Sequence, residues 1–290
     1  MFELPVKEQA TKTLTVKPNG RSSDFVPPNF ILGCNSECLY CYVHRFQRKY
    51  IYKNTNTDQI LGIIHNHCKS LGPKIPNQCD PIHHTYDIGC DVDLLYHFKD
   101  YDWVKVFDFF NYSDLNIKAT FATKYTHKIL RDYKVRDGKL RVRFSMLPKY
   151  MSDIVHVKVA SIPTQLKWME IAKNSGWDVH INLSPIIVYR DWLKDYDELL
   201  MTIKENYNHP NLKFEVIFLT HHEGLHLSNL QNGFERAEHF MWVPSIQEEK
   251  ISQYGGNNVR YKHQFKSELI KRFKEVFVKH FDEEQIRYIF

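Results

Sequence analysis

Short runs of β-forming residues alternate with stretches of helical spacing along most of this chain of 290 residues. Such alternation is typical of a mostly parallel sheet covered by helices, because each parallel strand needs a crossover before the next one. Too few strand–helix units are visible for a closed eight-unit barrel, so the pattern favours an α/β fold with an open, partial (βα) barrel. The predicted strands are 84–88, 104–110, 117–122, 140–145, 178–184 and 213–219, and the predicted helices are 57–71, 125–133, 164–175, 193–206 and 263–281.

One large domain is expected, with a short segment before it and an extension after it. Residues 1–29 are polar and irregular and form a lead-in, 30–220 form the partial barrel, and 221–290 form a C-terminal extension. The extension combines the long amphipathic helix 263–281 with a final strand-like IRYIF. A hydrophobic content of 43% is enough to bury such a core.

The sequence shows no targeting or membrane-spanning pattern. Its start lacks a basic region followed by an apolar one, and the longest apolar runs, such as 181–188, are far shorter than a membrane span. These features predict a soluble, cytoplasmic protein that does not associate with a membrane.

Residues 44–53 interleave arginine and lysine with aromatic side chains, in a chain whose formal net charge is +5. This pairing suits nucleic acids, because cations bind phosphates and aromatic rings stack on bases. An ordinary solvated surface explains the segment equally well. The charge therefore permits a nucleic-acid partner without demanding one.

Three of the six cysteines, Cys34, Cys38 and Cys41, form a C-x3-C-x2-C motif on one short loop. Three thiolates can hold three irons of a [4Fe–4S] cluster and leave the fourth iron without a protein ligand. That iron can chelate the amino and carboxylate groups of S-adenosylmethionine, whose reductive cleavage releases a 5′-deoxyadenosyl radical. The motif therefore predicts a radical S-adenosylmethionine (radical SAM) enzyme.

Other interpretations of the metal-binding residue types stay open. A zinc ion needs a fourth ligand, which His44 or Cys68 could supply, and three unrelated buried cysteines are also conceivable. Cys68 lies on a predicted helix and Cys79 in a proline-containing loop, and both are interpreted as structural. Two histidine pairs, 83–84 and 221–222, suggest metal sites, but without a carboxylate at ligand spacing a hydrogen-bonded or solvent-facing role is preferred.

Beyond the cysteine motif, the chain resembles the spore photoproduct lyases, radical SAM enzymes that revert a thymine dimer in DNA. The similarity runs with gaps from about residue 30 to the C-terminus, and it rests on the order and spacing of several short pieces. These are GCNSECLYCY at 33–42, TYDIGCDVD at 85–93, FATKY at 121–125, RVRFSM at 141–146, SPIIVYRDW at 184–192, KFEV at 213–216 and the terminal IRYIF.

The resemblance implies roles for individual residues. Cys34, Cys38 and Cys41 match the cluster ligands, and Cys90 matches the thiol that donates a hydrogen atom to the substrate. The other implied residues are Tyr40 and Tyr42, which return the hydrogen to the cofactor, Lys124 and Ser145, which contact S-adenosylmethionine, and Ser184, which begins a turn near the adenosine.

The position of these residues supports the implied roles. Cys90, Lys124, Ser145 and Ser184 each lie at or just past the C-terminal end of a predicted strand, where functional residues converge in a (βα) barrel. Each also has a simpler interpretation. Cys90 can be a small buried hydrophobic residue, the two tyrosines can merely pack beside the cluster, and Lys124 can be a surface lysine.

Three differences from the family concern the substrate. The segment before Cys34 is shorter than usual, and an acidic motif after the serine strand reads KVAS at 158–161. The basic, aromatic hairpin that enters DNA corresponds to 250–261, which has fewer arginines but keeps Tyr254 and Arg260 as nucleic-acid contacts. Tyr254 can still stack on a base.

The leading hypothesis is repair of a thymine dimer in DNA with Cys90 as hydrogen donor. One alternative keeps the radical chemistry but remodels a hypermodified thymine, as in phage DNA modification, and another is a non-catalytic zinc or iron–sulfur DNA-binding protein. The expected partners are DNA containing a modified thymine and an electron donor such as flavodoxin or ferredoxin, and the chain is expected to be a monomer.

Overall fold

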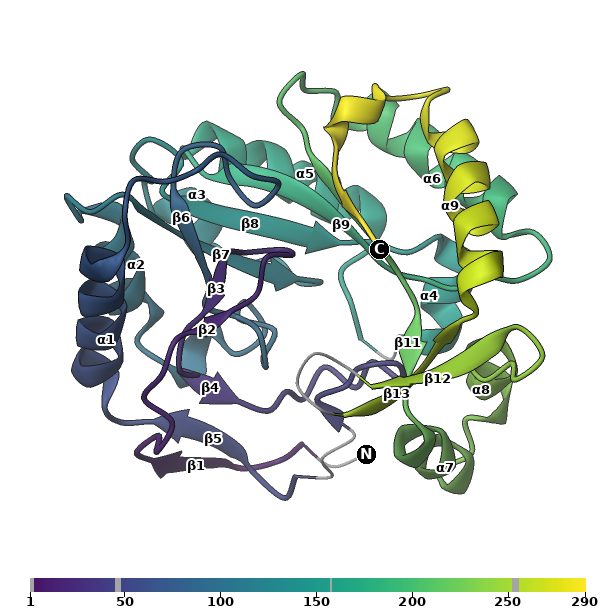
Figure 1. Ribbon diagram of the computed structural model, residues 1–290, viewed down its shortest axis with the longest axis horizontal. Coiled ribbons are helices and arrows are strands. Elements are labelled where there is room, and N and C mark those ends of the chain that lie inside the picture. Colours follow the sequence, from purple (N-terminus) through teal and green to yellow (C-terminus); the bar gives the residue numbers. More distant parts are fainter. Residues whose placement is uncertain (1–2, 45–47, 157, 252–255) are drawn as a thin grey trace. The chain divides into compact units, whose positions relative to one another are not determined.

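The computed structural model describes residues 3–44, 48–156, 158–251 and 256–290. They form two compact units, each built from several segments of the chain. The first unit comprises the chain up to Ser36, Arg48–Phe144 and Pro163–His180. The second comprises Glu37–Gln47, Ser145–Ile162 and Ile181–Phe290. Figure 1 traces the course of the chain through their elements.

The first unit contains a sheet with the strand order β8-β7-β6-β3-β2 and a smaller sheet with the order β1-β5-β4. The pairs β3–β6, β6–β7 and β7–β8 are parallel. The strands are β1 (Val6–Gln9), β2 (Lys17–Pro18), β3 (Phe25–Val26), β4 (Ile31–Leu32), β5 (Ile51–Asn54), β6 (His84–Asp87), β7 (Ile117–Thr123) and β8 (Leu140–Ser145). The α-helices are α1 (Thr57–Ser70), α2 (Trp103–Asn111), α3 (Ile129–Asp132) and α5 (Ile162–Asn174), and a short 3₁₀ helix, η2, spans Phe98–Asp100.

The central strands of this sheet confirm the sequence expectation. All residues of β6 and β8 are buried, as expected for parallel strands that are covered on both faces. The strands β6, β7 and β8 lie within one residue of the predicted ranges 84–88, 117–122 and 140–145.

The prediction of a strand at 104–110 is wrong, because this segment is the helix α2. Its β-branched and aromatic residues favour a strand locally, but its buried side chains Trp103, Val106, Phe107 and Phe110 recur at helical spacing. The side chain of Asp102 caps the helix by accepting a hydrogen bond from the backbone N–H of Lys105. The cap and the period of three to four residues outweigh the strand propensity.

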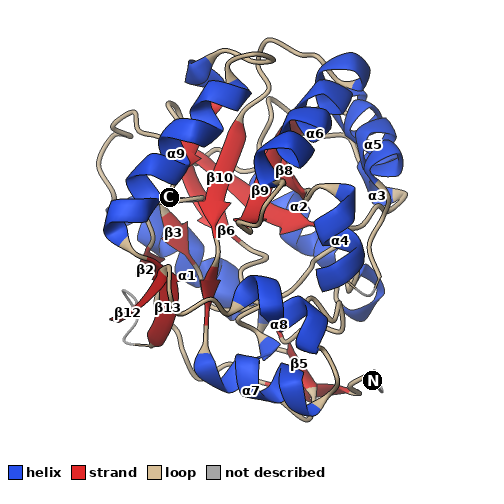
Figure 2. Cartoon of the chain, turned by 90° about the vertical axis from the view of Figure 1, so that its right-hand side faces the viewer, coloured by secondary structure: helices blue, strands red, loops and turns tan. Residues whose placement is uncertain are grey.

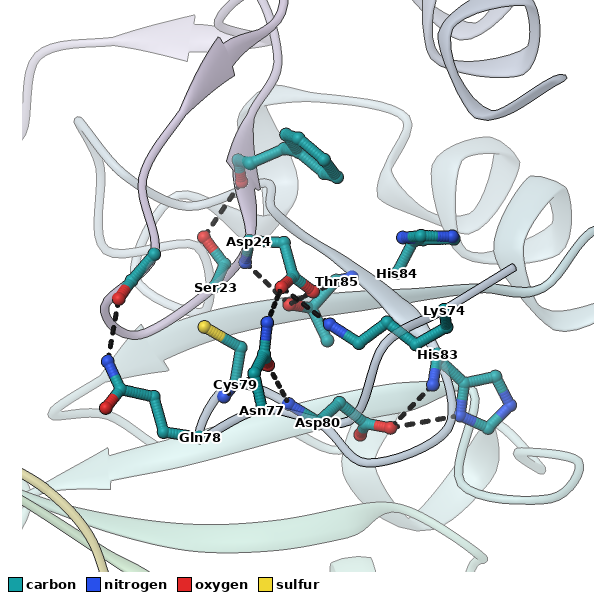
Figure 3. Close-up of polar contacts among 12 residues, drawn as sticks. Ser23, Asp24, Lys74, Asn77, Gln78, Cys79, Asp80, His83, His84 and Thr85 are labelled. Carbon is teal, nitrogen blue, oxygen red and sulfur yellow. Dashed lines mark hydrogen bonds and ion pairs between the residues drawn. The ribbon is translucent and has the colours of Figure 1, made fainter. Parts of the chain in front are cut away.

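Buried ion pairs hold the N-terminal ends of these strands. Figure 3 shows the carboxylate of Asp24 accepting hydrogen bonds from Lys74 Nζ at 2.6 Å, Asn77 Nδ2 at 2.7 Å and Thr85. The carboxylate of Asp80 accepts from Arg141 Nη2 at 2.6 Å and from Lys118 Nζ at 2.8 Å. Each of these charges needs its partner for the stability of the fold, because an unpaired buried charge is costly.

The second unit contains the strand order β14-β10-β9, in which both pairs are parallel, and the sheet β11-β13-β12. Strand β9 begins in the first unit and continues into the second. The strands are β9 (Asp178–Ile186), β10 (Phe214–Phe218), β11 (Thr220–His221), β12 (Gln247–Ile251), β13 (Asn257–Tyr261) and β14 (Ile286–Ile289). The helices are α4 (Lys149–Val155), α6 (Trp192–Asn206), α7 (Glu223–Gln231), α8 (Glu235–Met241), α9 (His263–Phe277) and the 3₁₀ helix η3 (Glu283–Gln285).

Helix α9 covers β10, as Figure 2 shows. The ring of Phe214 lies 5.0 Å from that of Phe277, and Phe273 meets Tyr196 of α6 at 5.7 Å. The predicted amphipathic helix and the final strand are therefore present, although α9 ends at Phe277, before the predicted end at 281.

Two other predicted ranges differ from the structure. The helix predicted at 125–133 is reduced to the short α3, and the expected irregular lead-in 1–29 contains the strands β1, β2 and β3. These strands are two to four residues long, too short to show a sequence period. Among the described residues, no helix has the length and apolar character needed to cross a membrane.

Candidate functional site

The division between the two units passes through the cysteine loop, so its two ends are described separately. In the first unit, Cys34 is buried, and the backbone N–H of Ser36 donates to its Sγ at 3.4 Å. The backbone N–H of Asn35 donates to Nε2 of His97 at 3.1 Å, and Nδ1 of His97 bonds the carboxylate of Asp100 at 2.7 Å. The start of the loop is thus fixed by a buried histidine.

In the second unit, hydrogen bonds hold the backbone of the loop from Cys38 to Cys41. The N–H of Cys41 donates to the carbonyl O of Cys38 at 3.0 Å, which closes a turn with these two cysteines at its ends. The N–H of Leu39 donates to the carbonyl O of Val155 at 3.1 Å, and its carbonyl O accepts from Asn229 Nδ2 at 2.9 Å. A turn within the loop and hydrogen bonds to Val155 and Asn229 therefore define the path of the loop.

Tyr40, between Cys38 and Cys41, has a partner that the sequence did not reveal. Its hydroxyl lies 2.6 Å from Nε2 of His156, and Nδ1 of His156 lies 2.9 Å from Oγ of Ser152. Burial, together with the nearby Cys38 and Cys41, raises the pKa of Tyr40 well above its usual value. Tyr40 is therefore a neutral phenol at physiological pH. Tyr42 is exposed.

The residues of the loop fit an iron–sulfur cluster. None of the six cysteines, all of which belong to the described residues, forms a disulfide, and two of the three in the motif, Cys34 and Cys38, are buried. The N–H group directed at the sulfur of Cys34 is the kind of contact that stabilises a cluster thiolate. Three thiolates without a fourth protein ligand in the motif match the donor set of a cluster with one open iron.

Two predicted site residues lie at the C-terminal ends of strands in the first unit. Cys90 lies three residues after β6 and is half-buried. It follows Gly89, where a Cβ would lie only 2.8 Å from Cβ of Phe121, so only glycine allows this close approach. Lys124 directly follows β7.

Asp93 holds the backbone at Lys124 in place. Its carboxylate accepts from the N–H of Lys124 at 2.8 Å and from Oγ1 of Thr123 at 2.7 Å. Burial raises the pKa of Asp93, against the opposing effect of Lys124 and of these hydrogen bonds. The sequence motif TYDIGCDVD contains Asp93, but no role had been assigned to it.

The two predicted serines belong to the second unit. Ser145 is the last residue of β8 and is buried, and its Oγ accepts from Asn182 Nδ2 at 3.2 Å. Ser184 was expected at a strand end, but β9 continues to Ile186, so Ser184 lies inside the strand. The bond between Ser184 and Pro185 is cis.

The expected hairpin at 250–261 is formed by the antiparallel strands β12 and β13. Tyr254 lies outside the described residues. Arg260 pairs across the hairpin with Glu248, and its Nη2 lies 2.9 Å from Oε1 of that glutamate. A contact between Arg260 and DNA therefore has to compete with this ion pair.

The histidine pairs have different surroundings. Nδ1 of His83 lies at an ion-pair distance of 3.5 Å from the carboxylate of Asp80 but makes no hydrogen bond with it, whereas Nε2 of His84 lies 3.1 Å from the carbonyl O of Gly72 and has the expected hydrogen-bonding partner. His222 caps α7 by accepting from the N–H of Gly224. His221 instead lies 3.0 Å from the carboxylate of Glu238.

Comparison with protein families decides where the chain belongs. The model of the family described as spore photoproduct lyase matches residues 8–290, which include the cysteine motif, Cys90 and both serines. This chain belongs to the spore photoproduct lyase family. The resemblance inferred from the short sequence pieces is confirmed.

The curated relatives are spore photoproduct lyases that differ considerably in sequence. The protein from Clostridium acetobutylicum is 24% identical over 208 residues, which cover 70% of this chain and 57% of that protein. The protein from Geobacillus sp. is 24% identical over 213 residues, which cover 71% of this chain and 59% of that protein. The chain thus spans less than three-fifths of the length of the curated relatives it matches.

Solved structures of spore photoproduct lyase share the fold. A mutant with bound S-adenosylmethionine and dinucleoside spore photoproduct has a TM-score of 0.80 at 18% identity, covering 98% of this chain and 81% of that chain. A complex with the dinucleoside spore photoproduct has a TM-score of 0.79 at 19% identity with the same coverage. The expected α/β fold, an open, partial (βα) barrel of the radical SAM type, is confirmed.

Proposed function

We propose that this chain is a radical SAM lyase that reverts spore photoproduct, a thymine dimer, in DNA. The proposal rests on one observation above the others: the family match runs through the cysteine motif and through Cys90, the residue type needed to quench a substrate radical. When bound, a [4Fe–4S] cluster with S-adenosylmethionine supplies the one-electron cleavage that yields a 5′-deoxyadenosyl radical. The residues of the chain bind the cofactors, orient the substrate and return the hydrogen atom.

The binding roles follow from chemistry at the strand ends. Cys34, Cys38 and Cys41 supply three thiolate ligands. The ammonium group of Lys124, whose backbone is anchored by Asp93, pairs with the carboxylate of S-adenosylmethionine. Ser145 supplies a hydroxyl for the same cofactor, and Ser184, inside β9, supports its adenosine.

The hydrogen transfers close as a cycle. Once a hydrogen atom has been abstracted from the lesion and the bond between the two thymines has broken, Sγ–H of Cys90 would donate a hydrogen atom to the resulting thymine radical. Tyr40 or Tyr42 would then return a hydrogen atom to the sulfur of Cys90 and would regain its own from 5′-deoxyadenosine. A hydrogen-donating thiol stays protonated, so Cys90 needs no neighbouring base. Access to the lesion in a duplex requires that the lesion leaves the base stack.

An anaerobic assay tests the proposal. Purified protein with reconstituted cluster, S-adenosylmethionine, a reductant and dinucleoside spore photoproduct is expected to release the repaired thymine dinucleoside. Cys90→Ala is expected to divert the thymine radical to other products, while 5′-deoxyadenosine is still formed. The matched control is Cys68→Ala, the same substitution at a buried position on α1, which is expected to keep the product distribution.

Three results would contradict the proposal at different levels. An unchanged product distribution in Cys90→Ala refutes the donor role alone. Formation of 5′-deoxyadenosine without any repaired product from spore photoproduct refutes repair and points to remodelling of a modified thymine. A protein with stoichiometric zinc and no iron after anaerobic purification refutes the radical chemistry.

A further inference from the structure

A second group of metal-binding side chains lies in the second unit, outside the cysteine motif. His221 on β11, His226 on α7 and Glu238 on α8 each offer a ligand atom, and these atoms all lie within 4.8 Å of one another. Nε2 of His221 is 3.0 Å, and Nδ1 of His226 is 2.6 Å, from Oε2 of Glu238. Ligand atoms around one tetrahedral ion with bonds of about 2.1 Å are about 3.4 Å apart, so small shifts suffice to admit an ion.

The burial of this group makes a cationic partner necessary. The side chain of Glu238 is 2% exposed, that of His221 0% and that of His226 15%. A buried carboxylate in contact with two imidazoles is stabilised by protonation of those imidazoles or by a metal ion.

The surroundings orient the ligands as in established metal sites. Nδ2 of Asn229 donates to Oε1 of Glu238 at 2.5 Å, which leaves Oε2 directed at the two imidazoles. The ring of Trp242 stacks on that of His226 with centroids 4.4 Å apart and planes inclined by 8°. Hydrogen bonds to the ligand carboxylate and packing against a ligand histidine are the outer-shell contacts that tune metal affinity.

We propose that Nε2 of His221, Nδ1 of His226 and the carboxylate of Glu238 bind one divalent transition-metal ion of the zinc class. Two imidazoles and one carboxylate, without a thiolate, are a donor set that suits Zn²⁺ and leaves a fourth position for water. The three ligands come from three elements, β11, α7 and α8, so the ion joins the parts of the chain that follow β10.

The site is connected to the cysteine loop through a single side chain. The same Nδ2 of Asn229 that donates to Glu238 also donates to the carbonyl O of Leu39, the residue after Cys38. An ion that fixes Glu238 therefore also fixes Asn229 and the backbone beside a cluster ligand. The inference does not depend on the proposed reaction, because the ion is bound by residues outside the cysteine motif.

The proposal is tested by measuring the zinc content of a variant that lacks the three thiolates of the cysteine motif. In a variant with Cys34→Ala, Cys38→Ala and Cys41→Ala, neither iron nor adventitious zinc can occupy the cysteine loop. After incubation with Zn²⁺ and removal of unbound metal, elemental analysis is expected to find about one zinc per chain. Co²⁺ in place of zinc is expected to give the visible bands of a tetrahedral site without the near-ultraviolet charge transfer of a thiolate ligand.

Substitutions of the ligands complete the test. In the same background, His226→Ala and Glu238→Gln are expected to abolish stoichiometric binding, and Asn229→Ala is expected to weaken the affinity for Zn²⁺ by about 10- to 100-fold. The matched control is His239→Ala, which removes an exposed imidazole from α8 and is expected to retain one zinc.

Circular dichroism distinguishes loss of the site from loss of the fold. Because Glu238→Gln preserves the shape and most hydrogen bonds of the side chain, a folded spectrum without zinc supports the proposal. It is overturned if the variant without the three motif cysteines binds no zinc, or if His226→Ala and Glu238→Gln hold as much zinc as His239→Ala. Iron content and formation of 5′-deoxyadenosine by the cysteine-intact protein are measured separately, so failure of the zinc site is distinguishable from failure of the proposed function.

Discussion

Replacement of Asp80 by asparagine removes the charge from a buried ion network in the first unit. The carboxylate of Asp80, 2% exposed, lies 2.6 Å from Nη2 of Arg141 and 2.8 Å from Nζ of Lys118. Its other oxygen accepts hydrogen bonds from the backbone N–H groups of Ile82 and His83. The substitution would leave two buried cations facing the single remaining carboxylate of Asp178.

The expected loss of stability follows from this burial. Removing one partner of a buried ion pair costs about 3–5 kcal/mol, because the remaining charge stays out of water. The matched control is Asp58→Asn, also in the first unit. Asp58 lies 2.6 Å from Lys105 Nζ, the same distance as in the Arg141–Asp80 pair, but the two side chains are 83% and 44% exposed. Exposed pairs contribute only about 0–1 kcal/mol, so Asp58→Asn is expected to lose much less stability than Asp80→Asn.

The dependence on pH gives a second, independent check. Burial, the largest single influence, would raise the pKa of Asp80. It is outweighed by hydrogen bonds from His83 and Lys118 and by the charges of Lys118 and Arg141, which hold the pKa far below its usual range. A carboxylate whose pKa is lowered by folding stabilises the protein above its unfolded pKa of about 4 and loses this contribution as the pH falls towards the folded pKa. The stability difference between wild type and Asp80→Asn should therefore be constant near neutral pH and shrink below about pH 4.

Urea unfolding followed by circular dichroism and tryptophan fluorescence measures both effects. The reasoning is refuted if Asp80→Asn loses no more stability than Asp58→Asn at pH 7. It is also refuted if the difference from wild type grows on acidification, because that would mean the network favours a protonated Asp80.

Three further substitutions test local features. Tyr40→Phe removes the hydroxyl bonded to His156 and should cost about 0.5–1.5 kcal/mol in urea unfolding. Because folding raises the pKa of Tyr40, this stabilisation is present below the unfolded pKa of about 10 and should diminish at higher pH; an unchanged difference in alkali would contradict it. Gly176→Ala places a Cβ against the carbonyl O of Val135 at a φ of +89° and should lower stability by about 1–3 kcal/mol. Gly62→Ala, with open space around it inside α1, should instead raise stability by up to about 1 kcal/mol, and equal effects of the two substitutions would refute the steric argument.

Features encoded over short stretches of sequence were predictable. The strands β6, β7 and β8 follow from their buried β-forming residues, and the positions of Cys90, Lys124 and Ser145 at strand ends follow directly from them. The segment of α2 shows the limit of this approach. Its Val and Phe residues have the propensity of a strand, while the cap at Asp102 and the contacts of its buried face decide for a helix.

The partners of the site residues were not predictable, because they are remote in sequence. Tyr40 and His156 are 116 residues apart, and Leu39 and Asn229 are 190 residues apart. Neither His156 nor Asn229 belongs to a motif or a periodic pattern that distinguishes it from other polar residues. Only the folded chain shows that the path of the cysteine loop depends on residues from α4, α7 and the segments next to them.

The same limit applies to the histidine pair at 221–222, for which the sequence predicts a hydrogen-bonded or solvent-facing role. A carboxylate at ligand spacing is a useful signal only when the ligands share one helix or one loop, where spacing determines geometry. His221 and Glu238 are 17 residues apart, on a strand and on a helix that are separated by α7. In such a case the distance between ligands is set by how the helices pack, so the sequence can neither predict a metal site of this kind nor exclude it. Zinc binding by the variant without the three motif cysteines would therefore reveal a site that sequence spacing cannot indicate.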